Sequence, residues 1–259
     1  MKKTLIALAV AASAVVSGSA MAAWTANATG GNLEIGGTLT PVEKVTPWEV
    51  KTGAAVTGLD ANIQKGQKIV DVSVNKAIPV LGIRNVVNGF KGVPAIDPQI
   101  NYNGAIDSTK FIEDGKGQVY LNATVNDDAG NKIGTMKTVL RVAAQANNGT
   151  YSNVMLYASS TDQGFFGGLP HSESGVFSSP DAYAYATGLF PGIADTWSDN
   201  GTSLKGTGEF DFSNGNNTYH AYYASGIPND VKLVITLDQP AAGDSIPWKV
   251  SLPLSVTYN

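Results

Sequence analysis

The sequence has no cysteine, only two histidines and few charged side chains among its 259 residues. Without thiols, disulfide bridges and thiolate metal sites are excluded. Lys and Arg number 17 against 21 Asp and Glu, and this net charge of −4 disfavours a basic nucleic-acid surface. No G-x-S-x-G motif of a serine hydrolase is present. The chain is instead 43% hydrophobic with 29 glycines, a composition that favours β-structure with many turns.

The N-terminus has the three parts of a secretory signal peptide. Lys2 and Lys3 form a basic start, residues 5–16 form an apolar run too short to span a bilayer, and small residues follow up to Ala22. We predict cleavage after Ala22, which makes residues 1–22 the signal peptide and Ala23 the first residue of an exported chain. Loss of the two lysines makes the mature chain more acidic.

Alternating apolar residues predict several strands and one hairpin. The predicted strands lie at residues 70–74, 119–125, 134–142, 231–237 and 248–258. Turn-forming residues at 126–131 predict that the second and third strands form a hairpin. One helix is expected to begin at Ser179-Pro180-Asp181 and to end near Gly188. Since no repeat or linker is found, we expect a single domain.

The last predicted strand has one apolar face. That face carries Trp248, Val250, Leu252, Leu254, Val256 and Tyr258. Only Asn259 follows, so we expect the strand to pair with an earlier part of the chain or with another molecule. Pro253 cannot donate to a ladder and is expected at an edge.

A segment after the signal peptide has the same period of two. Its alternate positions carry Thr29, Gly31, Leu33, Ile35 and Gly37. A short, glycine-flanked strand of this kind suits insertion into a groove of another subunit, where main-chain hydrogen bonds and side-chain pockets hold it.

The two terminal segments resemble those of chaperone-usher pilins. Thr-Gly-Gly-Asn-Leu-Glu-Ile at residues 29–35 is similar to a pilin donor strand, and the penultimate Tyr258 is similar to the pilin C-terminal signature. More narrowly, the chain resembles the FaeG-type major fimbrial subunits of enterotoxigenic Escherichia coli, which also act as adhesins. The similar pieces are residues 33–40, 48–53, 128–134, 165–169, 222–227 and 248–258.

This resemblance implies an all-β, incomplete immunoglobulin-like sandwich that is completed by donor-strand exchange. A periplasmic chaperone would first fill the groove, and at an outer-membrane usher the N-terminal strand of another copy would replace it. By position, the alternate residues of 29–37 would enter the groove, and the apolar face of 248–258 would form one wall. Gly31 would meet the narrowest pocket. The implied organisation is a signal peptide at 1–22, a donor extension at 23–40 and a pilin domain at 41–259.

Between about residues 160 and 226, weaker strand signals and frequent Gly, Ser and Asn predict an insertion that carries the short helix. Aromatic residues also cluster there, and rings that stack on sugars beside Asp and Asn side chains are typical of glycan sites. The candidates are Tyr183, Tyr185, Asp195, Trp197, Asp199 and Asn200, with His171 behind them. Alternatively, the two tyrosines pack the insertion onto the sandwich. The stretch departs from the FaeG-type pattern in length and sequence, so no sugar specificity is carried over.

The predicted function is a structural subunit of a cell-surface fimbria that also binds host glycoconjugates as an adhesin. A non-adhesive or minor fimbrial subunit is one alternative, and a secreted soluble lectin or glycosidase is an alternative of another class. Glu209 and Asp211 have the spacing of a glycosidase pair, but paired acids on a solvated strand face are far commoner. We therefore expect no enzymatic activity, no cofactor and no metal.

Overall fold

The computed structural model describes residues 26–27, 35–41, 44–149, 153–199, 201 and 203–259. The chain divides into two units, Met1–Lys44 and Val45–Asn259. In the first unit, residues 35–41 have no regular secondary structure. The expected signal peptide and the expected donor residues Thr29, Gly31 and Leu33 lie outside the described residues.

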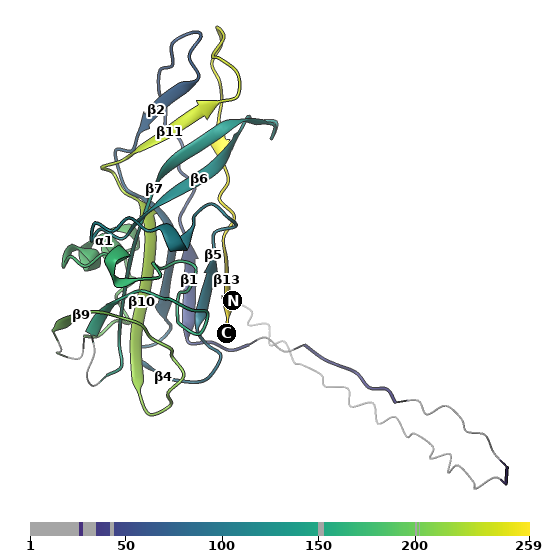
Figure 1. Cartoon of the computed structure of the whole chain (residues 1–259), viewed down its shortest axis with the longest axis vertical. Helices are drawn as coiled ribbons and strands as arrows, with labels where there is room; N and C mark the ends of the chain where they lie inside the picture. The colour runs from purple at the N-terminus through teal and green to yellow at the C-terminus, as the bar shows by residue number, and fades with distance from the viewer. Residues whose placement is uncertain (1–25, 28–34, 42–43, 150–152, 200, 202) are drawn as a thin grey trace, which may run out of the picture. The chain divides into compact units, whose positions relative to one another are not determined.

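The second unit is mostly β, with one short α-helix (Figure 1). Its strands are β1 (Trp48–Thr52), β2 (Ile69–Ser73), β3 (Ile78–Asn85), β4 (Phe90–Lys91), β5 (Pro98–Asn101), β6 (Gln118–Asn126), β7 (Lys132–Asn147), β8 (Asn153–Leu156), β9 (Leu204–Gly208), β10 (Thr218–Ile227), β11 (Lys232–Leu237), β12 (Lys249–Val250) and β13 (Ser255–Tyr258). The helix is α1 (Asp181–Leu189), and two 3-10 turns are η1 (Ser108–Lys110) and η2 (Glu173–Gly175). Within the described part of the chain, no helix is long and apolar enough to span a membrane.

The 16-residue strand β7 connects the two halves of the main sheet. Its first half pairs with β6 and β11, and its second half pairs with β10 and β8. The sheet runs β1-β3-β10-β7-β11-β2, and β12 joins it through β6. The antiparallel β6–β7 pair confirms the hairpin predicted around residues 126–131. β2 and β11 confirm the strands predicted at 70–74 and 231–237.

The C-terminal strand is present but broken into two pieces. β12 pairs with β6, and β13 pairs with β5 in a separate two-stranded sheet, so both pieces find partners earlier in the chain. The predicted alternation is confirmed, because the six apolar side chains from Trp248 to Tyr258 are half-buried and those between them are exposed. The gap at residues 251–254 contains Pro253, which has no N–H to contribute to a ladder.

The insertion expected at 160–226 ends earlier than the sequence suggested. β10 is a central strand between β3 and β7, so residues from Thr218 onward belong to the sheet. Its side chains are buried on both faces and therefore show no polar alternation. Tyr223 stacks on Phe165 at 5.7 Å in the main core, whereas Tyr222 belongs to a second apolar cluster with α1.

The helix predicted after Ser179 is confirmed and covers one face of the sheet. α1 begins at Asp181, whose backbone N–H donates to the Ser179 hydroxyl at 3.2 Å, and ends at Leu189. Ala182, Ala186 and Leu189 are buried in the second cluster. The main core contains a tight aromatic group around Trp48, with ring centroids 4.9, 5.4 and 5.0 Å from Phe90, Phe165 and Phe212.

Candidate functional site

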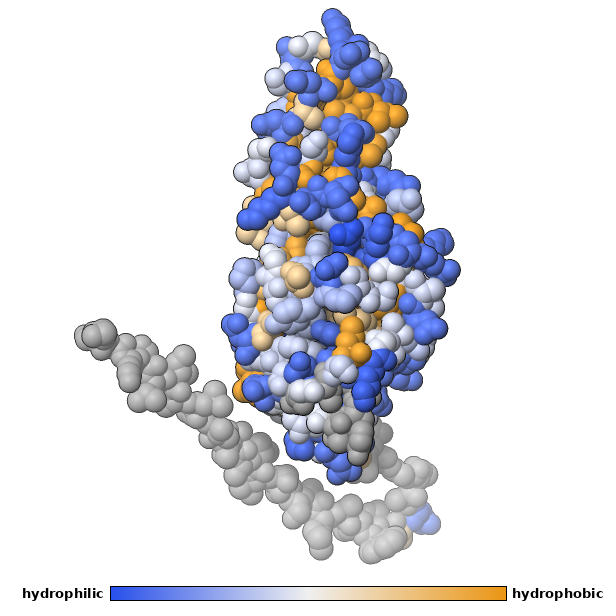
Figure 2. All heavy atoms as spheres, turned by 90° about the vertical axis from the view of Figure 1, so that its left-hand side faces the viewer, coloured by the Kyte–Doolittle hydropathy of each residue, from blue (hydrophilic) through white to orange (hydrophobic). Residues whose placement is uncertain are grey.

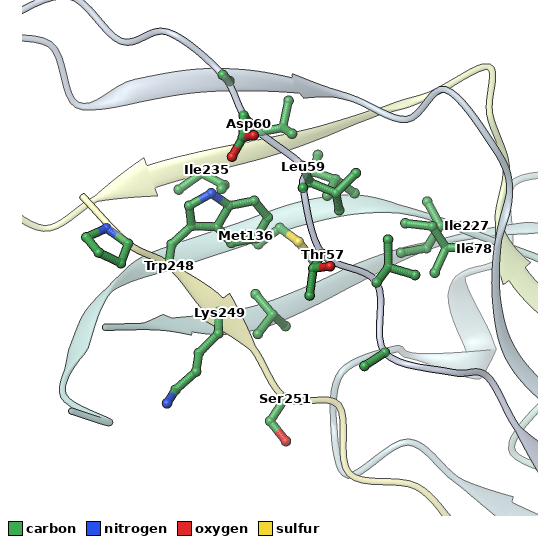
Figure 3. A pocket seen from close by; sticks show the side chains of 18 of the residues that line it. Thr57, Leu59, Asp60, Ile78, Met136, Ile227, Ile235, Trp248, Lys249 and Ser251 are labelled. Atoms are coloured by element: carbon green, nitrogen blue, oxygen red, sulfur yellow. The ribbon is translucent and has the colours of Figure 1, made fainter. Parts of the chain in front are cut away.

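An open apolar groove of about 1290 Å³ lies beside the C-terminal strand of the second unit (Figure 3). Its floor is built from inward-facing side chains of several strands of the main sheet. These are Val70 and Val72 of β2, Ile78 and Val80 of β3, Leu121 of β6, Met136 of β7, Ile227 of β10, and Leu233, Ile235 and Leu237 of β11. On the face shown in Figure 2, hydrophobic surface gathers in the upper half, the part that contains β2 and β11 in Figure 1.

One wall of the groove is the first part of the C-terminal strand. Four of the six predicted wall residues line it: Trp248, Val250, Leu252 and Leu254. Figure 3 shows Lys249 and Ser251 pointing away from Trp248, as a period of two requires. Val256 and Tyr258 do not line the groove, because beyond Pro253 the chain joins β5 and packs against the core there.

Two strand edges beside the groove carry no partner strand in the described part of the chain. β12 pairs only with β6, and β2 pairs only with β11. Residues 251–254 make no backbone–backbone hydrogen bond with other described residues. Unpaired N–H and C=O groups on an edge are a template for another strand.

Residues 54–63, here called the crossing segment, form the other side of the groove. None of the site residues expected from the sequence lies in this segment. In Figure 3 the chain that carries Thr57 and Leu59 runs between Trp248 on one side and Ile78 and Ile227 on the other. The crossing segment belongs to no strand, and its Leu59 packs against the core.

The size and lining of the groove suit an extended peptide better than a small molecule. Its volume exceeds the roughly 300–1,000 Å³ typical of small-molecule pockets. From Trp248 to Leu254 the wall is about 20 Å long at the usual rise per strand residue. An apolar floor between unpaired backbone edges offers side-chain pockets and main-chain hydrogen bonds together, which is the basis of strand addition.

The candidate glycan residues are only partly brought together. Tyr183 on α1 is 42% exposed, and its ring lies edge-on to Tyr222 at 6.2 Å. The half-buried Trp197 ring contacts the same Tyr222 ring at 5.1 Å. Asp195 is exposed and lies 3.5 Å from Arg84 Nη1. Two partly exposed rings therefore share one buried neighbour.

Tyr185 packs against its neighbours, as in the alternative in which the two tyrosines hold the insertion on the sandwich. Its hydroxyl donates to the Gly226 carbonyl at 3.0 Å, and its ring lies edge-on to Phe177 at 5.9 Å. Burial, which outweighs the nearby positive charge of Arg141, raises the pKa of Tyr185 well above its usual value.

The remaining candidates are not placed in a common site. Asp199 accepts from the Gly201 N–H at 2.9 Å, and Asn200 lies outside the described residues. His171 was expected behind the aromatic rings, but it contacts Ser108 at 3.1 Å and the Phe166 ring at 5.1 Å. It therefore packs at the edge of the main core, away from the α1 cluster.

The two acids weighed as a glycosidase pair have local partners. Glu209 accepts from the Ser159 N–H at 2.8 Å, and Asp211 accepts from the Ser213 hydroxyl at 3.0 Å. In the described ranges, no group of three or more His, Asp or Glu side chains is arranged to hold a metal.

Comparison with known proteins finds matches over the full length of the chain. The whole chain, residues 1–259, matches the family model described as "Fimbrial, major and minor subunit" (Fimbrial_K88). Over the full length of both chains, it is 29% identical to the K88 fimbrial protein AB and 28% identical to the K88 fimbrial protein AC, both from Escherichia coli. It is 27% identical, again over both full lengths, to the F41 fimbrial protein of Escherichia coli.

Proposed function

The chain belongs to the family of fimbrial major and minor subunits, and from this we propose that its groove accepts the N-terminal strand of another copy. Membership makes the protein a non-enzymatic structural subunit of a cell-surface fimbria that assembles with other subunits. It therefore removes the glycosidase alternative. The groove supports strand exchange as the mode of assembly.

The observation that carries the proposal is an apolar groove between two unpaired strand edges. Trp248, Val250, Leu252 and Leu254 present their side chains to it, while the backbone at 251–254 has no ladder partner among the described residues. A strand inserted there would bury its apolar face and would bond to the free backbone groups. The second unit is, in this view, an immunoglobulin-like sandwich that lacks one strand.

The N-terminal segment of another copy has the pattern that the groove requires. Leu33 and Ile35 are adjacent inward positions, and Gly31 and Gly37 flank them with no side chain. Ile35 is 89% exposed, so its apolar surface is available for burial during assembly. Full burial of one such side chain contributes about 1.5–3 kcal/mol. We further propose that a periplasmic chaperone occupies the groove before assembly and that an outer-membrane usher delivers the subunit.

Assembly of the mature chain tests the mode of polymerisation. We expect the chain that begins at Ala23 to polymerise, and we expect deletion of residues 23–40 to abolish the polymer. A synthetic peptide of residues 26–40 should then bind the truncated chain and raise its melting temperature. Electron microscopy and size-exclusion chromatography measure the first two outcomes. A stable monomer that needs no N-terminal segment would contradict donor-strand exchange.

We also propose that the fimbria is adhesive and that Tyr183 and Trp197 contact a host glycan. The support is that both rings are partly exposed and rest on the same buried Tyr222. Trp197→Ala should leave assembly intact and should reduce binding of the fimbriae on a glycan array. Tyr120→Ala is the matched control, because this exposed ring lies on β6, outside the α1 cluster. Unchanged binding by the Trp197 variant would assign that ring to packing.

A further inference from the structure

The crossing segment, residues 54–63, carries residue types similar to those of the expected donor strand. Thr57, Leu59, Ala61 and Ile63 alternate with Gly58, Asp60 and Asn62. In the N-terminal segment, the sequence likewise has Thr29, Leu33 and Ile35 at odd-numbered positions, with glycine among them. One chain therefore carries two stretches in which a threonine, a leucine and an isoleucine follow one another two or four positions apart.

The structure places this second stretch along the groove. Residues 54–63 all line it, and Leu59 and Ile63 are half-buried against the main core. The residues between and before them are exposed. Figure 3 shows Leu59 within the groove, across from Trp248. Leu59 and Ile63 of the crossing segment thus already cover part of the apolar core beside the groove.

Side chains alone hold the crossing segment in place. Residues 54–63 make no backbone–backbone hydrogen bond with other described residues. Such bonds resume only at the two ends, where Gly53 N donates to Val80 O at 3.1 Å and Gly66 N donates to Ala241 O at 2.8 Å. A stretch with few buried contacts and no ladder belongs to the part of a fold that opens most easily.

We infer that the crossing segment is an internal occupant of the groove, which covers the apolar floor in the free subunit and is displaced when the strand of a second copy enters. This inference rests on the proposed strand exchange. The exchange is favourable because an incoming strand gains main-chain bonds at the free edges in addition to apolar contacts, whereas the crossing segment has only the contacts. Leu59 and Ile63 therefore slow the exchange without preventing it.

Peptide uptake by the full mature chain tests the inference. The change Ile35→Asp in the chain's own N-terminal segment prevents self-assembly, and a fluorescent peptide of residues 26–40 then reports entry into the groove. With Leu59→Ser and Ile63→Ser combined, we expect uptake at least tenfold faster than with both residues native. Val87→Ser is the control, since Val87 is 56% exposed and does not line the groove, and the uptake rate of this variant should not change.

Other outcomes of the uptake experiment overturn the inference in distinguishable ways. If the crossing segment is a fixed wall, the Leu59 and Ile63 changes slow uptake or weaken the final complex. If the chain with native Leu59 and Ile63 takes up no peptide at all, the proposed strand exchange fails, and the inference fails with it.

The absence of cysteine allows a second measurement with single introduced thiols. In Ile63→Cys, the thiol should react slowly with an alkylating reagent in the free subunit and at least tenfold faster in the polymer. In Asp60→Cys, the thiol starts from an exposed position and should react at the same rate in both states. Stronger protection of the position-63 thiol in the polymer would show that the crossing segment stays in the groove, against the inference.

Discussion

Replacing Ile35 with alanine tests which face of the N-terminal segment enters a neighbouring subunit. Ile35 is 89% exposed in its own chain, so nearly all of its transfer free energy is gained only on assembly. Burying an isoleucine contributes about 1.5–3 kcal/mol, and the alanine variant forfeits most of that. A loss of about 2 kcal/mol corresponds to a dissociation constant roughly 30-fold higher, at about 1.4 kcal/mol per factor of ten.

The assay is a fluorescence-anisotropy titration of the chain that lacks residues 23–40 with peptides of residues 26–40. The native peptide sets the reference, and the Ile35→Ala peptide should bind roughly 30-fold more weakly. Glu34→Ala is the matched control, because Glu34 alternates with Leu33 and Ile35 and would face away from the floor. A peptide that tolerates Ile35→Ala, or loses as much with Glu34→Ala, would refute the assigned facing of the strand.

Three further predictions concern the stability of the second unit. In Gly134→Ala, the added Cβ would lie 2.3 Å from Thr236 O on the paired strand, so the free energy of unfolding in urea should fall by about 1–3 kcal/mol. In Gly188→Ala, the Cβ added to α1 would have no atom within 4 Å. This change should therefore raise the free energy of unfolding by about 0.5–1 kcal/mol. Burial raises the pKa of Tyr102 from 10.0 to about 12, so the protonated hydroxyl stabilises the fold fully below pH 10 and progressively less as pH rises toward 12. For Tyr102→Phe, urea titrations across this pH range should show that the free energy of unfolding declines less steeply with rising pH than in the native chain. An equally steep decline would contradict the raised pKa of Tyr102.

The local sequence pattern was enough to predict elements that have one buried and one solvated face, and the start of the helix. The alternation at 119–142 predicted the β6–β7 hairpin, because one face of each strand is buried and the other is solvated. Ser179-Pro180-Asp181 predicted the start of α1, because capping is a property of neighbouring residues. The same reasoning did not find β10, since a strand buried on both faces has no polar alternation to detect.

The sequence by itself showed a period of two at residues 29–37 and 248–258, and the resemblance based on these patterns led to the correct family. Only the tertiary structure decided where the groove wall ends, because pairing with β5 takes the chain beyond Pro253 away from it. Only the tertiary structure also brought residues 54–63 to the same groove as the segment 248–254. These two segments are far apart in the chain, and their approach depends on how the whole β-structure packs. A local sequence pattern carries no information on such long-range packing.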